Sequence, residues 1–361
     1  MTEEFMQYAQ KLKTQKLFET EDFFQASARE HIPQFQNNFR ILCEQIGRMQ
    51  KDGSLGVLSY LEFTLLHTNV ILGKDTAEVR VYDDNWYFDS RQRIAGQFDY
   101  SFLSVCYREL CSQLLSARKR FAGIHAHDIH AFLLSSASEF YRYVAAFCRM
   151  AILECTATEA FQSLQRADEF EIHAGEYMAY TESVYRENRT KNAKDALKWL
   201  SKRLEYDYAY EDFSGLDFTN ADLSETDLRY ADFRSTILCG ADLQEAMLAG
   251  TRFHHADMRN ADLRYCLLHE ADFTGADLSG ACFSYAKAYS GISSRKKWMA
   301  PGFARTDFTK ARLCGADFRK AAIRDAVFQD AVMDGALFFE HQLEQYDLSA
   351  AQKKAVCITS L

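Results

Sequence analysis

The sequence predicts an α + β chain in two parts: a mainly α-helical N-terminal domain with a small β-hairpin, and a five-residue solenoid of the β-helix type. Two observations carry this prediction. Apolar residues recur at helical spacings within residues 1–205, and an apolar residue stands at every fifth position within 206–348, interrupted once at 289–302. Residues 349–361 follow as a tail that we expect to cap the solenoid.

The five-residue period rests on 26 apolar positions. Since hydrophobic residues make up 48% of the chain, chance would leave about half of these positions polar, so the pattern is an internal repeat. A second position, two residues earlier, is also ordered: between 221 and 286 all 14 of its occupants are Ala, Thr or Cys. The apolar positions are Phe213, Phe218, Leu223, Leu228, Phe233, Leu238, Leu243, Leu248, Phe253, Met258, Leu263, Leu268, Phe273, Leu278, Phe283, Ala288, Phe303, Phe308, Leu313, Phe318, Ile323, Phe328, Met333, Phe338, Leu343 and Leu348.

A period of five fits neither a helix, at about 3.6 residues per turn, nor a plain strand, at about two. It suits a solenoid in which each five-residue unit forms one side of a coil and then turns a corner. The apolar residue and the small residue two positions before it then both point inward, as alternation along a strand requires. The second residue must be small because four large side chains already fill each layer of the coil.

Units with the pattern Ala-Asp-Leu-x-x, such as those that begin at Ala221, Ala261 and Ala276, resemble the pentapeptide-repeat family. The resemblance covers roughly 140 of the 361 residues. It implies a right-handed quadrilateral β-helix with four repeats in each coil. At both ends of the array the small position holds a large residue, which indicates frayed or capping coils. These residues are Glu211, Leu216, His341 and Tyr346.

Residues 1–205 show no five-residue period and resemble no family that we recognise. Apolar side chains three and four positions apart predict helices in this part of the chain. Between them, Glu78–Tyr82 alternates polar and apolar residues, Asp83–Asn85 offers turn chemistry, and Trp86–Phe88 follows, which predicts a β-hairpin. The predicted helices are 3–18, 34–49, 100–118, 127–155 and 190–204.

The ten cysteines form no Cys-x-x-Cys pair, and several occupy apolar positions where a free thiol behaves as a small hydrophobic residue. The sequence shows no signal peptide and no apolar run long enough to span a membrane. We therefore expect a reduced cytoplasmic protein without a cofactor and without membrane binding. A specialised secretion route is an alternative that this composition leaves open.

Charge is distributed in bands along the chain, whose net charge is −9. Residues 206–280 hold 15 acidic and 5 basic side chains, a net −10, whereas 281–325 hold 3 acidic and 10 basic ones, a net +7. Residues 326–348 return to −5. Because a solenoid converts bands of sequence into bands along a rod, the predicted rod is not uniformly acidic.

The interruption of the repeat at 289–302 is the first candidate binding site. Its cations, with their neighbours, would attract an anionic phosphate, nucleic acid or protein surface. Trp298 could stack on a base or anchor a protein partner, but it also keeps the five-residue phase and could instead plug the coil interior. The alternative for the cations is a solvated loop. The candidate residues are Lys287, Arg295, Lys296, Lys297, Trp298 and Arg305.

A second candidate surface follows from four repeats per coil, since residues twenty apart then stack. Asp227, Met247, Leu267 and Lys287 would form one column whose middle is apolar where other columns carry mostly Asp. An exposed apolar patch on a charged solenoid often contacts another surface. We expect Met247 and Leu267 to face the N-terminal domain, a second copy or a partner, or else to be isolated apolar residues without a role.

The only dense histidine cluster is His125, His127 and His130, with Asp128 among them. It resembles the metal-binding signature of metallo-β-lactamase-like hydrolases, although the Asp stands one position early. A zinc or iron site is one interpretation. The other, which we favour, is a helix start whose imidazoles are solvated. An enzyme within 1–205 is therefore a minor alternative.

An Asp precedes many of the core residues, and this recurrence has two interpretations. The aspartates either form an acidic surface that mimics DNA, or they bond to nearby backbone amides in the turns. Some pentapeptide-repeat proteins mimic DNA and modulate type II topoisomerases, which makes that role the second functional hypothesis. The first is a non-enzymatic interaction protein with a protein partner or a second copy of itself; nucleic acid is a weaker alternative. The aspartates are Asp212, Asp217, Asp222, Asp227, Asp232, Asp242, Asp257, Asp262, Asp272 and Asp277.

Overall fold

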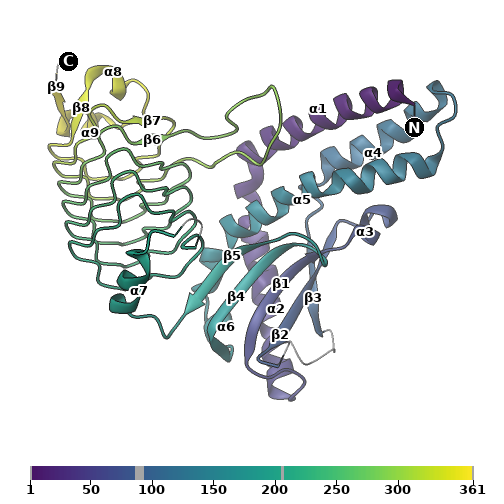
Figure 1. The fold of residues 1–361 in the computed structure, drawn as a ribbon, viewed down its shortest axis with the longest axis horizontal. Coiled ribbons are helices and arrows are strands. Elements are labelled where there is room, and N and C mark those ends of the chain that lie inside the picture. Colours follow the sequence, from purple (N-terminus) through teal and green to yellow (C-terminus); the bar gives the residue numbers. More distant parts are fainter. Residues whose placement is uncertain (1, 86–92, 205–206, 360–361) are drawn as a thin grey trace. The chain divides into compact units, whose positions relative to one another are not determined.

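The computed structural model describes residues 2–85, 93–204 and 207–359. The chain divides into two compact units (Figure 1). The first, the α/β unit, comprises residues 1–189 together with 292–302, and the second, the rod, comprises 190–291 and 303–361. The boundary therefore falls about 16 residues before the predicted one at 205/206, and most of the interruption in the repeat belongs to the α/β unit. No helix among the described residues is long and apolar enough to cross a membrane.

The four long helices of the α/β unit match predicted helices, and two short ones were not predicted. The first helix continues beyond its predicted end, since Thr20 and Phe24 extend its buried face. Thr2 caps it by accepting a hydrogen bond from the amide of Phe5. The helices are α1 (Glu3–Ser27), α2 (Ile32–Lys51), α3 (His67–Leu72), α4 (Val105–Ala117), α5 (Ala126–Thr156) and α6 (Glu159–Gln162), with short 3-10 turns at Ala28–His31 and Arg118–Arg120.

A five-stranded mixed sheet corrects the prediction of a mainly helical domain with one hairpin. Its order is β3-β2-β1-β4-β5, with β1 and β4 parallel and the other pairs antiparallel. The predicted strand 78–82 lies in β2, but the predicted second arm, 86–88, lies outside the described residues. The strands are β1 (Leu58–Leu65), β2 (Thr76–Asp83), β3 (Arg93–Asp99), β4 (Arg166–Glu176) and β5 (Thr181–Asn188).

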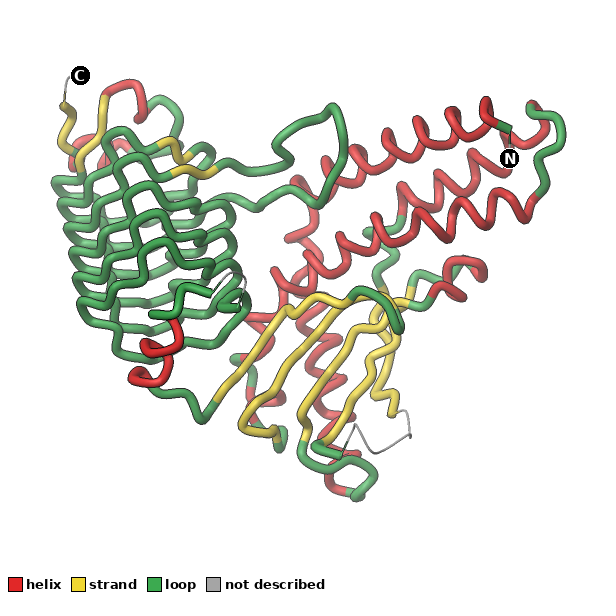
Figure 2. Tube along the Cα trace, in the orientation of Figure 1, coloured by secondary structure: helices red, strands yellow, loops and turns green. Residues whose placement is uncertain are grey.

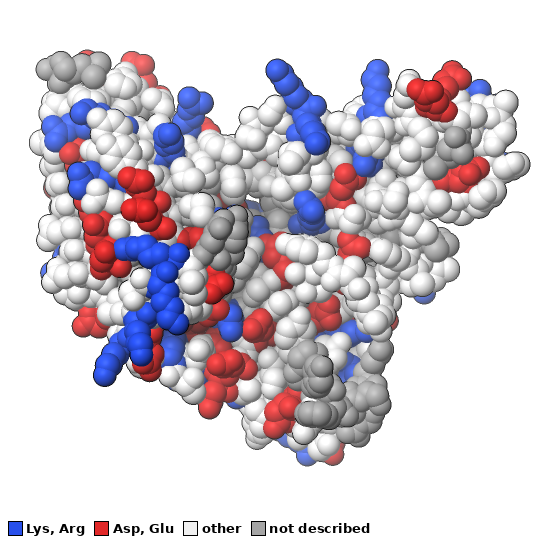
Figure 3. All heavy atoms as spheres, in the orientation of Figure 1, with Lys and Arg blue, Asp and Glu red and all other residues white. Residues whose placement is uncertain are grey.

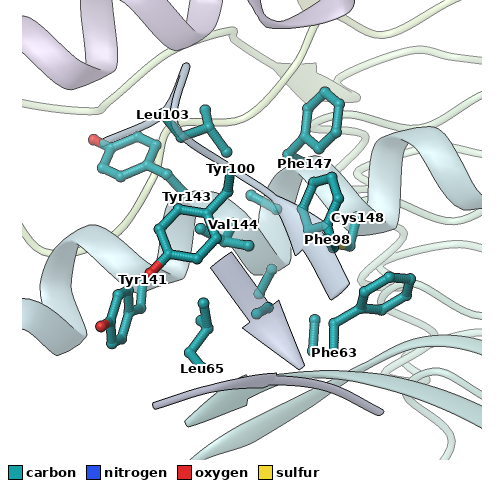
Figure 4. Close-up of a cluster of buried hydrophobic side chains, with 14 of the residues drawn as sticks. Phe63, Leu65, Phe98, Tyr100, Leu103, Tyr141, Tyr143, Val144, Phe147 and Cys148 are labelled. Carbon is teal, nitrogen blue, oxygen red and sulfur yellow. The ribbon is translucent and has the colours of Figure 1, made fainter. Parts of the chain in front are cut away.

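The sheet and the helices share one apolar core. Alternate residues of β1 point to the same face, so Leu61, Phe63 and Leu65 pack against helices while Tyr60 and Glu62 point the other way. Figure 4 shows Phe63, Phe98 and Phe147 pointing toward one another from β1, β3 and α5. The helix α2 packs on β3 and α5, and α5 packs on β4 and β5 (Figure 1).

The rod is a stack of coils in which residue i pairs in parallel with residue i+20, as the ladder Asp212, Asp232, Arg252 and Asp272 shows. Four five-residue units therefore complete one coil, as predicted. The interruption makes one step longer: Asp272 pairs with Asp307, 35 positions on instead of 20, so the insertion adds 15 residues, or three units. The chain leaves and re-enters the coils at this point (Figure 2). The core positions point inward, and six phenylalanines stack along one side: Phe213, Phe233, Phe253, Phe273, Phe308 and Phe328.

Threonine and cysteine at the small inner position have a definite role. The hydroxyl of Thr236 donates a hydrogen bond to the carbonyl of Phe213 at 3.0 Å, and Thr251 reaches the carbonyl of Leu228 at 2.8 Å. The thiol of Cys266 lies 2.9 Å from the carbonyl of Leu243 in the same relation. In each of these three, a carbonyl of the preceding coil accepts the hydrogen of the buried group. Thr226, at the same kind of position, donates instead to the carbonyl of Leu223 in its own coil, at 2.6 Å.

Both ends of the rod are capped. At the first coil, Leu200 of α7 (Ala193–Leu200) is buried, and Trp199 of the same helix packs on Phe213. At the last coil, the side-chain amide of Gln342 donates hydrogen bonds to the backbone carbonyls of Phe318 and Ala321, both at 2.9 Å. Tyr346, one of the large residues that depart from the pattern, is buried and donates to the carbonyl of Ile323 at 2.8 Å. The remaining elements are β6 (Lys287–Ala288), β7 (Ala322–Ile323), β8 (Leu337–Phe339), α8 (Glu340–Leu343), α9 (Ala350–Ala355) and β9 (Cys357–Thr359), which pairs with β8.

Candidate functional site

The insertion is built into the α/β unit by Trp298. This side chain is only 8% exposed and belongs to the apolar core of that unit, not to the interior of the rod. Its indole N–H donates a hydrogen bond to the hydroxyl of Tyr143 on α5 at 2.8 Å, and the two rings lie 6.1 Å apart. The expectation that Trp298 plugs a coil, or stacks on a bound base, is therefore corrected. It is in phase with the repeat because the insertion is three units long.

Around Trp298 the backbone of the insertion is held by polar groups of α1 and α5. Glu21, which is buried, accepts hydrogen bonds from the Tyr143 hydroxyl at 3.0 Å and from the amide of Gly302 at 2.9 Å. Arg142 donates to the carbonyl of Met299 at 3.0 Å. Burial raises the pKa of Tyr143, and the charge of Glu21 adds to the effect, so the phenol stays neutral and can donate.

The predicted basic residues lie in both units and are exposed. Arg295 forms an ion pair with Asp22 of α1, and Lys296 and Lys297 extend into solvent beside it. Lys287 and Arg305 are exposed on the rod. The insertion thus places its cations at the surface while its tryptophan is buried, and only the cations are accessible to an anionic partner.

The predicted apolar column exists as a ladder. Asp227 pairs with Met247, Met247 with Leu267, and Leu267 with Lys287. Met247 and Leu267 are half-buried, whereas Asp227 is buried and bonds to the guanidinium of Arg229. The stacking of residues twenty apart is confirmed, and a partner at this column remains a prediction.

The histidine cluster forms the first turn of α5. His125 is the N-cap residue, and its amide donates to the carboxylate of Asp128 at 2.9 Å, so this Asp caps the helix. His125, His127 and His130 are all exposed. Within residues 2–85, 93–204 and 207–359, no three His, Cys, Asp or Glu side chains are grouped to hold a metal ion. The helix-start interpretation is confirmed.

A cavity of about 230 Å³ lies in the α/β unit, between α3, α4, α5 and the segment that joins β3 to α4. Three buried tyrosines, Tyr100, Tyr107 and Tyr141, contribute to its wall. Tyr100, Leu103, Tyr141 and Val144 appear together in Figure 4. The buried polar residues Asn69 and Ser104 also line it. The apolar residues of the wall are Leu103, Leu115, Leu133, Leu134, Phe140 and Val144.

Charged and polar groups surround the mouth of this cavity. Lys74, Arg108 and His130 are exposed there, and Arg108 forms an ion pair with Asp75. The backbone is fixed at this edge, because the amide of Tyr100 donates to the carbonyl of Asp75 at 2.9 Å and that of Lys74 donates to Asn69 at 2.8 Å. Of the charged side chains at the mouth, Lys74 and Arg108 are basic and Asp75 is acidic, so positive charge is in excess.

The groups inside the cavity are held in their neutral forms. Burial raises the pKa of Tyr100 to about 12 and that of the Cys111 thiol to about 11. It also raises the pKa of Tyr107 and Tyr141. The Tyr107 hydroxyl is committed to the carbonyl of Leu133 at 2.8 Å. A nucleophilic thiol or phenol needs a lowered pKa, so this wall is suited to binding rather than to covalent chemistry.

Sequence analysis did not identify this cavity. Its residues come from four segments and follow no motif with fixed spacing. Of the lining residues, His130 also belongs to the histidine cluster, for which the sequence suggested a metal site. By contrast, the recurrent aspartates behave as predicted for turns: in all ten, Oδ1 accepts a hydrogen bond from the amide two residues later.

The match to a known protein family falls within the rod. A family model for pentapeptide repeats matches residues 212–244, 227–264, 256–288 and 303–338. The N-terminal region has no family match, and no curated protein sequence matches the chain. Among solved structures, a pentapeptide repeat protein from the Arabidopsis thaliana thylakoid lumen is 25% identical, with 35% of this chain and 74% of that chain covered and a TM-score of 0.25.

Two further structures are similar at lower identity. QnrB1, a plasmid-mediated fluoroquinolone resistance protein, is 16% identical, with coverage of 42% of this chain and 90% of its own and a TM-score of 0.26. HetL of Nostoc sp. strain PCC 7120, involved in heterocyst differentiation regulation, is 23% identical, with coverage of 40% and 92% and a TM-score of 0.17.

Proposed function

Because residues 212–338 are pentapeptide repeats, we propose that the chain is a non-enzymatic interaction protein whose rod binds an acidic surface of a protein partner. The observation that carries this proposal is the state of the charges on the rod. The right-handed, quadrilateral form that the family implies gives such a rod four flat sides, on which side chains recur at a fixed spacing.

The carboxylates of the rod are largely engaged within it. Five arginines bind the aspartate two residues earlier, as Arg264 binds Asp262, and each such pair leaves little free negative charge. Figure 3 shows acidic and basic side chains interspersed on the visible face of the rod. This arrangement favours a surface of mixed charge over a mimic of DNA, which needs unpaired acidic groups.

Some basic side chains of residues 281–325, by contrast, are not paired with a carboxylate that the structure describes. Lys287, Lys310, Lys320 and Arg324 are exposed, and no ion pair involves them among the described residues. The ladder pairs Lys287 with Ala322 and Cys282 with Asp317, so these cations lie on two neighbouring coils. Clustered exposed cations attract an anionic surface over a distance that salt limits.

The test measures binding of poly-L-glutamate, which represents an acidic protein surface. A short DNA duplex, measured in parallel, represents the alternative partner, nucleic acid. We expect salt-sensitive binding of poly-L-glutamate by the full chain, lost in a variant with Lys287, Lys310, Lys320 and Arg324 each replaced by Glu. The control replaces four exposed lysines elsewhere in the chain: Lys11, Lys51, Lys119 and Lys194.

Two outcomes would change the proposal. Tighter binding of the duplex than of poly-L-glutamate would make nucleic acid the partner. Concentration-dependent self-association that the same charge reversal abolishes would make a second copy the partner, since residues 206–280 carry a net −10. Equal loss in the control variant would contradict a role for this band of the rod.

A further inference from the structure

The cavity of the α/β unit has features of a ligand site that neither the rod nor its partner explains. Its wall is mostly apolar and aromatic, and at its mouth two basic side chains, Lys74 and Arg108, stand against one acid, Asp75. We propose that it binds a monocyclic aromatic carboxylate, with the ring among the buried tyrosines and the carboxylate at Lys74 and Arg108.

The size of the cavity sets the size of the ligand. An apolar cavity of about 150 Å³ is large enough for benzene. The cavity here, about 230 Å³, is therefore large enough for one benzene-sized ring with a short acidic substituent, and it is too small to enclose a whole nucleotide.

The wall selects an aromatic ring. Tyr107 and Phe140 lie with their ring centroids 4.9 Å apart, and Tyr100 and Tyr141 meet edge to face at 6.1 Å. Such pairs present both ring faces and ring edges to the space between them, and a planar ring can pack against either. Aliphatic residues on α5, among them Leu133 and Val144, complete the enclosure.

The mouth selects the charge of the ligand. Lys74 forms no ion pair with any residue that the structure describes, while the guanidinium of Arg108 is oriented by Asp75 and lies 3.0 Å from the hydroxyl of Ser104. Asp75 is the sole acid in the lining, so a carboxylate is attracted and an ammonium group is not.

Isothermal titration of the full chain with phenylacetate tests the proposal, with hexanoate, 2-phenylethanol and phenethylamine as matched ligands. Phenylacetate should bind saturably at millimolar or lower concentration, and each matched ligand should bind at least about fivefold more weakly. Replacing Lys74 with Ala should weaken phenylacetate binding about fivefold, while replacing Lys51, which is exposed and does not line the cavity, should not.

A blocking variant locates the site. Leu115 lines the cavity but is 40% exposed, so Leu115→Trp can close the mouth without overpacking the core. It should weaken phenylacetate more than tenfold, whereas Ile41→Trp, at a residue 50% exposed on α2, should leave affinity unchanged. His130→Trp on the facing helix gives a second block if Leu115→Trp fails to fold.

Three results would overturn the proposal. Phenethylamine binding as tightly as phenylacetate would exclude an anionic ligand, and equal affinity for hexanoate would exclude an aromatic one. Phenylacetate affinity that survives both blocking variants would place its site elsewhere. Because none of these measurements involves the basic coils of the rod, their failure leaves the proposed function of the rod unaffected.

Discussion

The indole N–H of Trp298 donates to the hydroxyl of Tyr143 at 2.8 Å, joining residues 155 positions apart. A tryptophan from an insertion in the repeat array is thus a core residue of the α/β unit. The Tyr143 hydroxyl in turn donates a hydrogen bond to the carboxylate of Glu21, which also accepts one from the backbone amide of Gly302. This buried polar chain fixes the insertion, and it leads to the first two predictions.

Trp298→Ala should destabilise the α/β unit by about 3 kcal/mol or more, because it empties a large buried volume. Trp298→Phe keeps most of the apolar contact but removes the hydrogen bond. The lost hydrogen bond should cost about 1 kcal/mol of stability, in addition to the loss from the smaller ring. Urea denaturation of the full chain measures both. Met299→Ala is the control, since Met299 is 66% exposed; a similar loss in that variant would contradict the assignment.

Tyr143→Phe should destabilise the same unit by about 1–3 kcal/mol, since the Trp298 N–H loses its acceptor and Glu21 loses a donor in a buried place. When Tyr143→Phe is combined with Trp298→Phe, the losses should fall short of their sum by about 1 kcal/mol. A double-mutant cycle in urea provides the test. Strict additivity would mean that the hydrogen bond contributes nothing measurable.

In the rod, Leu263→Asp should abolish cooperative folding of the coils, because Leu263 is 0% exposed and an unpaired charge would enter a solid core. Arg264→Asp at the next residue should be tolerated, since the Arg264 side chain is 43% exposed. Thermal unfolding of the two variants, followed by circular dichroism, separates them. Equal losses would refute the inward and outward assignments.

The rod should lose stability in acid. Hydrogen bonds from Arg203, and then from Ser224, lower the pKa of Asp222 to about 2, and the pKa values of Asp217, Asp257 and Asp317 are also lowered. A carboxyl whose pKa is lower in the folded state stabilises that state above its unfolded pKa, near 4, and the contribution disappears as the pH falls toward 2.

Melting temperatures measured between pH 5 and pH 2 provide the check on this sign. Asp222→Asn should reduce the melting temperature at pH 5 and flatten its fall toward pH 2, because one titrating group is removed. Glu225→Gln, at an exposed corner of the same coil, should leave the slope unchanged. A slope identical in Asp222→Asn and the unmodified chain would refute the assignment.

The alternative function also has a direct test. If paired carboxylates make the rod a poor DNA mimic, micromolar protein should leave the supercoiling activity of a type II topoisomerase unchanged, with or without a fluoroquinolone. Inhibition or protection would restore DNA mimicry as the leading hypothesis. The variant with Lys287, Lys310, Lys320 and Arg324 replaced by Glu is informative in the same assay, because it carries a more acidic surface.

The rod was predictable because each of its units satisfies local rules. A core residue and a small inner residue recur every five positions, and in many units an Asp accepts the amide of its own turn. The period predicted a solenoid, and the resemblance to pentapeptide repeats implied the four units per coil that the stacking at i+20 confirms. The helices α2, α4 and α5 were predictable for the same reason, since their apolar stripes are local. The strands β1 and β4 carried a usable signal that the prediction missed, in the alternation of 61/63/65 and 170/172/174.

What the tertiary structure alone decided depends on contacts between distant segments. The parallel pairing of β1 with β4 joins positions more than 100 residues apart, and no local period records it. Because the insertion is three whole units long, Trp298 stays in phase with the five-residue repeat. The phase therefore does not tell whether this side chain lies inside the rod or in the core of the α/β unit. The cavity exists only where α3, α4 and α5 meet, because its walls come from residues that share no spacing in the sequence.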